Sequence, residues 1–418
     1  MSEKLAINGG TPVRSIPMPP NYPGATSMGK EEEKEVLEVL ASQTLFRYYG
    51  PQNPLMKVKQ FETDTAKRLG AKNCVAVTSG TASLIVALHA AGIGPGDKVI
   101  VPACTFIATP GSVVAVGAVP VFCDIDESMT MDPDKIKDCI DPDVKAIIPV
   151  AILGYPCKMD RIMEEAKKYN LLVIEDIAQS MGSSYQGKAC GTFGDLGCFS
   201  LQINKILSSG EGGCVVTNDD KLYERAVRYH DQGMFREKEG FLNVNEEADI
   251  FLGADYRMSE LSGAVACAQI KKLDSIIEKM LKNMRMIQEG IKDIEGIQFA
   301  TENDPAGVCG NSLIMFFPTV EKKKAFCAAM EAEGTPLSAL YNSEPIYMVP
   351  QLMQKRVSNK TGFPFNQFDE EIVYTPDMCP TATDLMARHA WVAIGPEHTE
   401  QECKDYIAAF HKVAKEIL

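Results

Sequence analysis

Short apolar runs alternate with amphipathic stretches through the first two-thirds of the chain, and this alternation limits the fold more than any other feature. The apolar runs have the composition of buried strands. They are CVAVT (74–78), KVIVP (98–102), AIIPV (146–150), LLVIE (171–175) and GCVVT (213–217). Helical periodicity fills the segments between them, for example residues 83–92 and 159–170. Strands and helices in this alternation predict an α/β fold whose mostly parallel sheet lies between helices.

The pattern changes after a long helical region, which we expect to run from about Met258 to Ile294. Short strands, such as residues 312–318, then alternate with helices, such as residues 322–334. A chain of 418 residues is long enough for more than one domain. We expect an N-terminal arm rich in glycine and proline (1–30), a large domain (31–285) and a smaller C-terminal α+β domain (286–418).

Composition excludes several classes of function. The formal net charge of −14 argues against general binding to nucleic acid or to anionic membranes. No apolar run is long enough to span a membrane, and MSEKLAINGGTPVR lacks the apolar core of a signal peptide. We therefore expect a cytoplasmic protein whose 13 cysteines are reduced and mostly buried. The cysteines form no CxxC pair and the 5 histidines are scattered, so we expect no metal site.

Ligands of open α/β proteins bind at the carboxyl ends of the strands, and the first expected strand ends next to Ser79-Gly80-Thr81. This turn enters a helix. Free backbone N–H groups and the helix dipole at that point suit a phosphate, and the two hydroxyls add donors. An ordinary helix N-cap fits the same three residues.

Two further residues carry charge where the surrounding sequence is apolar. Asp176 ends the run LLVIE, and a carboxylate at that depth needs a backbone N–H, an arginine or a protonated ring nitrogen as its partner. Lys205 lies in CFSLQINKILSSGEGG, and by itself it fits a surface lysine on a loop. A lysine that forms a Schiff base, an aspartate beside a pyridinium nitrogen and a phosphate cup are together the parts of a pyridoxal phosphate site. Phe106, which follows another strand, is a candidate to stack on the ring, although a core phenylalanine fits equally.

Longer stretches occur in an order that is specific as a set. They are LAINGGTPVR, LFRYYGP, TSGTASL, GPGDKVIVPACTFIAT, GAVPVFCDID, VIEDIAQSMGSSYQGKACGTFGDLGCFSLQINK, GEGGCVVTND, GADYRMSELSGAVACAQIKKLD and CPTATDLMARHAWVAIGPEHT. Over most of its length the chain thereby resembles the DegT/DnrJ/EryC1/StrS family, which comprises the pyridoxal-phosphate-dependent sugar and cyclitol aminotransferases of fold type I.

The resemblance implies roles for particular residues. It gives Lys205 the Schiff base and the transfer of the proton at the α-carbon, and it gives Asp176 the pyridinium nitrogen. The other cofactor contacts that it implies are Gly80, Thr81 and Ser200 at the phosphate, Phe106 over the ring, Gln179 near the 3-hydroxyl, Gln202 beside the cofactor and Asp255 at the phosphate of a neighbouring subunit.

The chain departs from the family pattern at two positions. Asp255 in GADYR stands where many members have asparagine, and an ionised aspartate would repel a phosphate dianion. It is therefore protonated, or bridged by a cation such as Arg257, or carried by a loop that lies elsewhere. Ala151 in VAILG replaces a histidine that often lies near substrate, so the resemblance does not name the acceptor.

The implied reaction is ping-pong transfer of an amino group from L-glutamate or L-glutamine to a keto-sugar or keto-cyclitol, in a homodimer with shared active sites. The donor's α-carboxylate needs a cation, for which Arg257 and Arg47 are candidates. Tyr48, Tyr49 and Tyr341 are candidates for the sugar pocket. Surface arginines and core or surface tyrosines would give the same pattern.

Three alternatives from other classes of protein fit part of the sequence. The nearest alternative is a pyridoxal-phosphate-dependent dehydratase or epimerase. Some relatives are dehydratases that have histidine at the lysine position, but this chain keeps Lys205 and has no histidine at 204–206. A dinucleotide-dependent oxidoreductase would need a GxGxxG motif that the first strand–helix unit lacks. An inactive homologue with a regulatory role is disfavoured by the intact Lys205 and Asp176.

Overall fold

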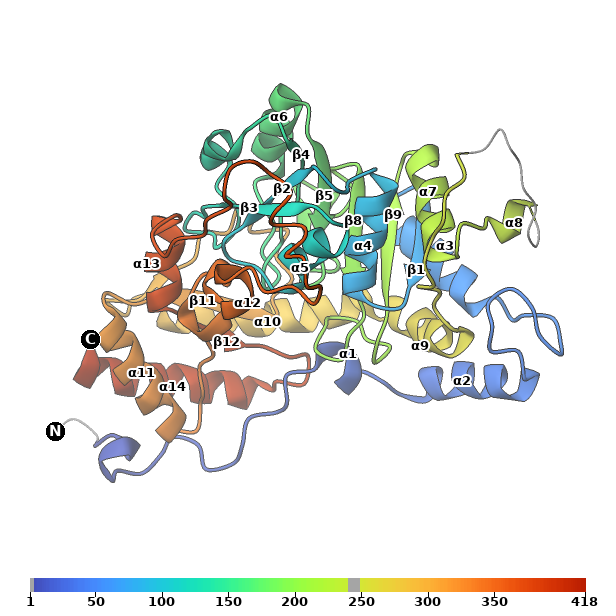
Figure 1. Ribbon diagram of the computed structural model, residues 1–418. Helices are drawn as coiled ribbons and strands as arrows, with labels where there is room; N and C mark the ends of the chain where they lie inside the picture. Colours follow the sequence, from blue (N-terminus) through green and yellow to red (C-terminus); the bar gives the residue numbers. More distant parts are fainter. Residues whose placement is uncertain (1–3, 240–248) are drawn as a thin grey trace.

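A seven-stranded sheet forms the centre of the larger part of the molecule in the computed structural model, which describes residues 4–239 and 249–418 (Figure 1). Its strands, in spatial order, are β1 (Asn73–Val77), β9 (Gly213–Thr217), β8 (Leu196–Ser200), β5 (Leu172–Asp176), β4 (Val144–Ile147), β2 (Lys98–Pro102) and β3 (Val119–Cys123). β9 is antiparallel to β1 and to β8, whereas all other neighbours are parallel. The predicted α/β fold with a mostly parallel sheet is thus confirmed.

Helices flank this sheet, and the most deeply buried of them is α4. The flanking helices are α4 (Gly80–Ala90), α5 (Ala108–Ala115), α6 (Met159–Tyr169) and α7 (Asp220–His230). α4 is apolar on nearly all sides because it packs on β8 and β9 and also contacts α5 and α7. α6 instead has one apolar stripe, which includes Met159 and Ile162, and its lysines face the solvent. Burial of α4 fixes its N-terminus next to the ends of the strands.

A second group of helices lies at the β1 end of the sheet (Figure 1). It contains α2 (Lys30–Ser42), α3 (Lys57–Leu69), α9 (Glu260–Ile270) and the short α8 (Arg236–Glu239). α9 packs on α2 and α3, and a Cβ at Gly263 would lie 2.6 Å from the Val58 Cγ2 atom. The Glu260 carboxylate accepts hydrogen bonds from the first N–H groups of α3, at Lys57 (2.7 Å) and Val58 (3.1 Å).

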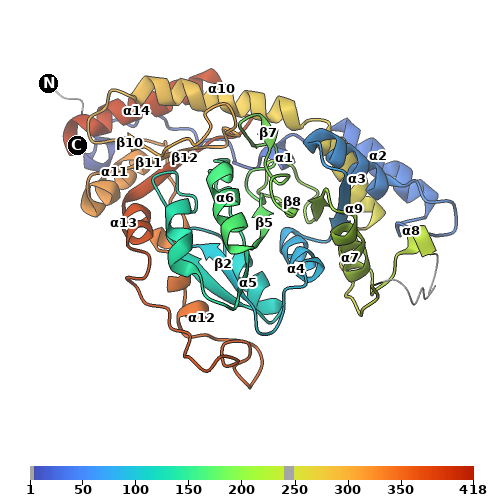
Figure 2. The ribbon, with the colours of Figure 1, turned by 90° about the horizontal axis from the view of Figure 1, so that it is seen from above.

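A smaller antiparallel sheet with its own helices forms the other end of the molecule (Figures 1 and 2). The sheet consists of β10 (Gln298–Phe299), β11 (Ser312–Phe316) and β12 (His389–Ala393), and the helices are α10 (Leu273–Ile291), α11 (Val320–Ala332), α13 (Pro380–Arg388) and α14 (Glu400–Ile417). The expected helix from Met258 to Ile294 is two helices, α9 and α10, separated at Lys271–Lys272. The predicted boundary after residue 285 falls inside α10, and the division into domains stays a prediction.

The N-terminal arm runs along the smaller sheet's helices and reaches the larger part. The Glu333 carboxylate accepts N–H groups of Ala6 (2.8 Å) and Val13 (3.0 Å) of the arm, and Lys412 pairs with it at 2.9 Å. Farther along, the Gly24 N–H donates to the Lys205 carbonyl oxygen (3.2 Å). The remaining elements are η1 (Ala6–Asn8), α1 (Pro23–Thr26), η2 (Pro133–Cys139), β6 (Ser184–Tyr185), β7 (Lys188–Ala189), η3 (Tyr341–Ser343), η4 (Ile346–Met348) and α12 (Pro350–Met353).

Two kinds of feature are absent from residues 4–239 and 249–418. None of the helices there is both long and apolar enough to cross a lipid bilayer. Within the same residues, no three histidine, cysteine, aspartate or glutamate side chains gather as a metal site would require.

Candidate active site

A cavity of about 430 Å³, the main cavity, lies where β5 and β8 end and α4 begins. Nine of the predicted residues line it: Gly80, Thr81, Phe106, Asp176, Gln179, Ser200, Gln202, Lys205 and Tyr341. The other lining residues are Ser79, Leu84, Ala108, Ala178, Asn204 and Glu211. Residues that lie up to 262 positions apart in the sequence, from Ser79 to Tyr341, therefore meet around one space.

Lys205 is held by a turn that follows β8. Its backbone N–H donates to the Gln202 carbonyl oxygen (2.9 Å), and the Asn204 N–H donates to the Gln202 Oε1 atom (2.8 Å). Ile206 and Leu207 come next and are buried, so they anchor the turn. Burial lowers the pKa of the Lys205 ammonium, and the negative charge of Asp176 opposes that shift. A larger fraction of the amine is therefore neutral than in an exposed lysine, as a nucleophile or a base requires.

Asp176 lies at the end of β5 and is buried. Its carboxylate accepts hydrogen bonds from the Thr109 hydroxyl (2.8 Å) and from the Ala178 N–H (3.1 Å). Burial raises the pKa of the Asp176 carboxyl, whereas these two donors and Lys205 act in the opposite direction. Among the described residues, no lysine, arginine or histidine pairs with this carboxylate within 4.0 Å. A buried carboxylate in that position suits a cationic group of a bound molecule.

The start of α4 lies against the end of β8 and forms another part of the lining of the main cavity. The Ser79 hydroxyl oxygen accepts the Ala82 N–H (3.0 Å) and caps the helix. At Gly80 a Cβ would lie 2.6 Å from the Ser200 Cβ, so only glycine fits between the helix and β8. The first N–H groups of a helix point outward without partners in the helix, and there they attract an anion.

Gln179, Tyr341 and Phe106 complete the main cavity. The Gln179 amide donates to the Tyr341 hydroxyl (3.1 Å), and the Phe106 and Tyr341 rings are 6.2 Å apart. Phe106 is 51% exposed, so it is not the core phenylalanine that its sequence would equally fit. Tyr341 begins three successive residues with positive φ (44°, 59° and 66°), a strained backbone that persists only where the surrounding structure holds it. The Lys323 ammonium donates to Ser343 in this turn (2.7 Å).

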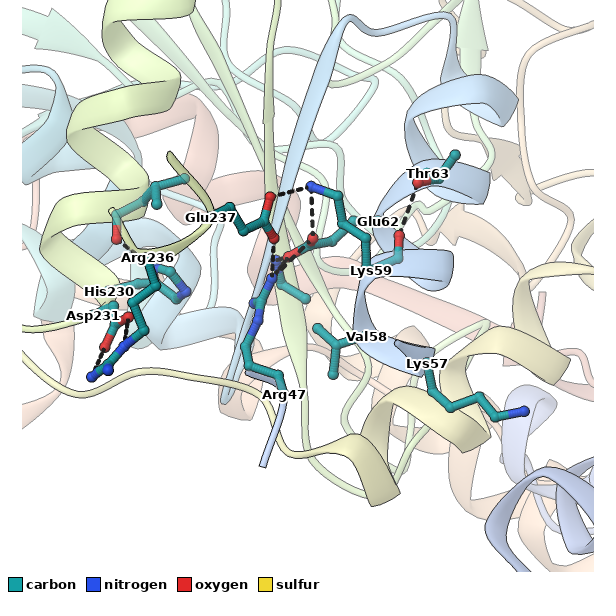
Figure 3. A network of polar contacts seen from close by, with 12 residues as sticks. Arg47, Lys57, Val58, Lys59, Glu62, Thr63, His230, Asp231, Arg236 and Glu237 are labelled. Carbon is teal, nitrogen blue, oxygen red and sulfur yellow. Dashed lines mark hydrogen bonds and ion pairs between the residues drawn. The ribbon is translucent and has the colours of Figure 1, made fainter. Parts of the chain in front are cut away.

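The structure does not bring Arg47, Tyr48 or Tyr49 to the main cavity of the same chain. The Arg47 guanidinium makes a buried ion pair with the two oxygens of Glu62 (2.8 and 3.0 Å), as Figure 3 shows. Tyr48 packs against this arginine, with 5.0 Å between the guanidinium carbon and the ring centre. Within this chain the charge of Arg47 is thus engaged by Glu62, and a role toward the donor carboxylate stays a prediction.

Asp255 and Arg257 also lie outside the lining of the main cavity. Arg257 pairs with Asp255 (2.6 Å) and with the buried Asp231 (2.6 Å), and Asp231 in turn pairs with Arg236 (2.7 Å). The ion pair with Arg257 is what the explanation by a bridging cation requires, and the role of Asp255 stays a prediction. The position of Asp255 away from this chain's own cavity is compatible with a role toward another subunit.

Three polar side chains of the site were missed by sequence reasoning: Thr109, Asn204 and Glu211. Asn204 and Glu211 flank Lys205 in the sequence, and their nearness to it is a signal that could have found them. Thr109 lies 67 positions from Asp176 in an apolar segment, and no local pattern marks it.

Comparison with known proteins agrees with this geometry. The family model described as the DegT/DnrJ/EryC1/StrS aminotransferase family matches residues 26–411. The chain is 34% identical over 302 residues to the L-glutamine:2-deoxy-scyllo-inosose aminotransferase of Streptomyces kanamyceticus, which covers 70% of this chain and 69% of that protein. It is 30% identical over 395 residues to the spore coat polysaccharide biosynthesis protein SpsC of Bacillus subtilis, and this match covers 93% of this chain and 95% of that protein.

Solved structures give the same answer for the fold. The structure of an aminotransferase from Psychrobacter cryohalolentis matches with a TM-score of 0.79 at 28% identity, over 94% of this chain and 98% of that one. The fold is that of the fold type I aminotransferases. Because the family model covers most of the chain, the chain belongs to the DegT/DnrJ/EryC1/StrS aminotransferase family.

Proposed function

We propose that the protein transfers an amino group from L-glutamine or L-glutamate to the keto group of a sugar or cyclitol, with pyridoxal phosphate as its cofactor and Lys205 as its catalytic amine. The observation that carries the proposal is the meeting of Lys205, Asp176 and the start of α4 around one cavity. Members of this family depend on pyridoxal phosphate. The relative from Streptomyces kanamyceticus is named for an L-glutamine donor and a keto-cyclitol acceptor, which supports both halves of the reaction.

The residues present fit the cofactor. A glycine is required at position 80, where the helix start approaches Ser200, and this leaves the helix N–H groups, Thr81 and Ser200 to hold a phosphate. Asp176 is buried without a cationic partner among the described residues, and a protonated ring nitrogen would supply one. Phe106 and Gln179 lie in the same lining, where they would contact the ring and its 3-hydroxyl, and Gln202 would lie beside them.

The chemistry can be divided between the cofactor and the chain. When bound, pyridoxal phosphate supplies an aldehyde that condenses with amines and a ring that stabilises negative charge on the adjacent carbon. Lys205 supplies a neutral amine, which burial favours, and moves the proton at the substrate carbon that bears nitrogen. Asp176 keeps a proton on the ring nitrogen, and the hydrogen bonds from Thr109 and Ala178 orient its carboxylate for that task.

We further propose that two copies of the chain form the working enzyme. Large apolar side chains are exposed on the segments near Arg47 and Arg257; they are Leu45, Tyr49, Leu55, Met56 and Leu252, the last of which is 93% exposed. Exposed apolar side chains in such number favour an interface with another protein surface. A second copy would bring Asp255 and Arg257 toward its neighbour's main cavity. Arg257 pairs with Asp231 and Asp255 in its own chain, so it would have to exchange one of these pairs to receive the donor carboxylate.

An absorbance measurement tests the proposed function. The purified protein, supplied with pyridoxal phosphate, should absorb near ~420 nm and shift to ~330 nm with L-glutamine or L-glutamate. Release of the corresponding keto acid would then exclude a dehydratase. Lys205→Ala should lose both the first band and amino transfer while it keeps its far-ultraviolet circular dichroism spectrum. Turnover by Lys205→Ala at the wild-type rate would refute the assignment of the amine.

A further inference from the structure

The loop that carries Lys205 is closed by its own hydrogen bonds. We call residues 201–212 the lysine loop. The Leu201 N–H donates to the Gly212 carbonyl oxygen (2.8 Å), and the Ser209 N–H donates to the Leu201 carbonyl oxygen (2.9 Å). The Lys205 side chain lines the main cavity from the middle of this loop. The position of the amine therefore depends on how the whole loop is held.

Two backbone groups of the lysine loop bond to distant parts of the chain. The Lys205 carbonyl oxygen accepts the N–H of Gly24 in α1 (3.2 Å), and the Ser208 N–H donates to Oε1 of Gln269 in α9 (3.2 Å). We call Gly24 and Gln269 the two anchors of the loop. Ser208 and Gln269 are completely buried, so water could not replace their bond if the amide were lost. The anchors fix the loop at Lys205 itself and shortly after it.

The Gln269 amide has one possible orientation, because Glu32 of α2 lies on its other side. Its Nε2 atom donates to the Glu32 Oε1 atom (2.9 Å). An ionised carboxylate only accepts hydrogen bonds and a backbone N–H only donates them, so the amide must turn its nitrogen to Glu32 and its oxygen to Ser208. Burial raises the pKa of the Glu32 carboxyl, but the hydrogen bonds that it accepts, chiefly from Lys272 and Gly29, outweigh burial and lower it. The row of hydrogen bonds from Glu32 to Ser208 therefore has a fixed polarity.

Glu32 also holds the segment that carries the first anchor. Its Oε2 atom accepts the Gly29 N–H (2.7 Å) and the Lys272 ammonium (2.8 Å). The same ammonium donates to the Ser27 carbonyl oxygen (2.9 Å). Ser27 and Gly29 follow directly after α1. One carboxylate, on a residue that is only 4% exposed, is thus connected to both anchors of the lysine loop.

The contact at the first anchor is close. A Cβ at Gly24 would lie 2.5 Å from the Ser208 nitrogen and 2.7 Å from the Leu207 carbonyl carbon, so a larger residue would displace the loop. A second cavity, of about 240 Å³, has lining residues from both the arm and the loop, and its lining includes Asn21, Pro23, Lys205 and Trp391. The N-terminal arm therefore lies directly against the lysine loop.

We propose that Gln269 is a positioning residue for Lys205, and that Glu32 sets the orientation of its amide. Both residues lie outside the lining of the main cavity, so they act through the backbone of the lysine loop. Proton transfer at a substrate carbon depends on the placement of the amine, and a displacement of about 1 Å can lower a rate about 100-fold. The inference rests on the proposed function and adds to it two residues that hold the catalytic amine in place.

Exchange of the two side chains tests the polarity of this row. Glu32→Gln sets an amide NH2 group against that of Gln269, because the new amide oxygen stays with its backbone and lysine donors. Gln269→Glu sets a second carboxylate against Glu32, where a 2.9 Å hydrogen bond lies in the native chain. Glu32→Gln combined with Gln269→Glu restores every donor and acceptor, because the amide and the carboxylate have changed places.

Hydrogen exchange of the holoenzyme, measured by mass spectrometry, reports on the lysine loop without turnover. We expect peptides that cover residues 201–212 to exchange about tenfold faster in each single variant and at the wild-type rate in the double variant. Gln367→Met is the matched control, because Gln367 also joins two backbone groups, at Gly96 (2.7 Å) and Gly117 (3.1 Å), but lies outside the lysine loop and the main cavity. Unchanged exchange of the loop in both single variants would overturn the proposal. If one single variant does not fold, the other and the double variant make the same comparison.

The donor half-reaction provides the second readout and separates positioning from stability. It is followed at ~420 nm with L-glutamine or L-glutamate. Its rate at saturation should fall about tenfold in each single variant, while the half-saturating donor concentration stays within about twofold. The double variant should recover most of the rate. A lower melting temperature with an unchanged rate would overturn the proposal in favour of a purely structural role, and so would a double variant as slow as the single ones. If the wild type reacts with neither donor, the proposed function fails, whereas hydrogen exchange still tests the anchors.

Discussion

Substitution of Arg47 by methionine separates a structural cation from one that binds substrate. The side chains of Arg47 and Glu62 are only 4% and 3% exposed, so the substitution leaves the Glu62 carboxylate buried without its main partner (Figure 3). Removing one member of a buried ion pair costs about 3–5 kcal/mol. Glu62 keeps the Ala76 N–H (2.8 Å) and the more distant Lys59 (3.9 Å), which places the expected loss of stability at the lower limit, about 3 kcal/mol.

A thermal melt followed by circular dichroism, with pyridoxal phosphate in excess, converts this energy into a temperature. Unfolding entropy of roughly 2.1 cal/mol/K per residue gives about 0.9 kcal/mol/K for a chain of this length, so 3 kcal/mol lowers the midpoint by about 3–4 °C. Arg47→Met combined with Glu62→Gln should lose about 2 kcal/mol less than the sum of the two single substitutions, because the buried unpaired charge is gone.

Lys59→Met serves as the control for the same network. Lys59 is 38% exposed and pairs with Glu237 at 2.8 Å, and an exposed pair of this kind contributes about 1 kcal/mol or less. The reasoning would be refuted if Arg47→Met melted within about 1 °C of wild type and instead raised the donor KM tenfold or more. That result would return Arg47 to the substrate site.

Three further outcomes are expected. Gly80→Ala places a Cβ 2.6 Å from the Ser200 Cβ, so the affinity for pyridoxal phosphate should fall about tenfold in a titration of the apoenzyme. Adding Ser200→Gly should restore this affinity. An unchanged affinity in Gly80→Ala would contradict a phosphate site at the start of α4. Asp176→Asn removes a charge-assisted hydrogen bond worth about 3 kcal/mol, and kcat/KM should fall about 100-fold with the fold intact; a loss below threefold would refute the assignment. Burial lowers the pKa of His389 to about 4, and its neutral Nε2 accepts the Leu340 N–H (2.8 Å). Because the unfolded histidine takes up a proton near pH ~6.5, this stability is complete above that pH and is lost as the pH falls toward 4, by about 2 kcal/mol at pH 5. Urea unfolding at pH 7.5 and pH 5.0 should show a smaller difference in His389→Gln than in wild type, and equal differences would contradict the prediction.

The positions of strands could be predicted from the sequence where a continuous apolar run marks the strand. Each of the five apolar runs corresponds to a strand of the main sheet, because continuous burial on both faces leaves a continuous apolar segment. β3 and β8 were not predicted: β3 contains Pro120 and β8 contains Gly197, residues that are uncommon inside strands. The antiparallel direction of β9 also escaped prediction, since direction depends on the connection between strands and not on the strand's own residues.

The residues of the candidate site also differ in whether the local sequence marks them. Lys205 and Asp176 could be found because each breaks an apolar segment with a charge. Thr109 carries no such mark, since a threonine in an apolar segment becomes informative only when the fold brings its hydroxyl to the Asp176 carboxylate. Arg47 is the opposite case, because its motif points to substrate, whereas its partner Glu62 lies in a separate helix and nothing near Arg47 in the sequence marks this ion pair.

The distance along the chain between Asn21 and Trp391 also bears on how the enzyme is made. A ribosome adds roughly 5–20 residues per second, so tens of seconds separate the synthesis of Asn21 from that of Trp391, although both line one cavity with Lys205. Lys205 is made about halfway through that interval, so the amine exists for a further period before the strand β12 does. A nascent or truncated chain that ends before β12 would therefore carry the amine without that wall of the cavity.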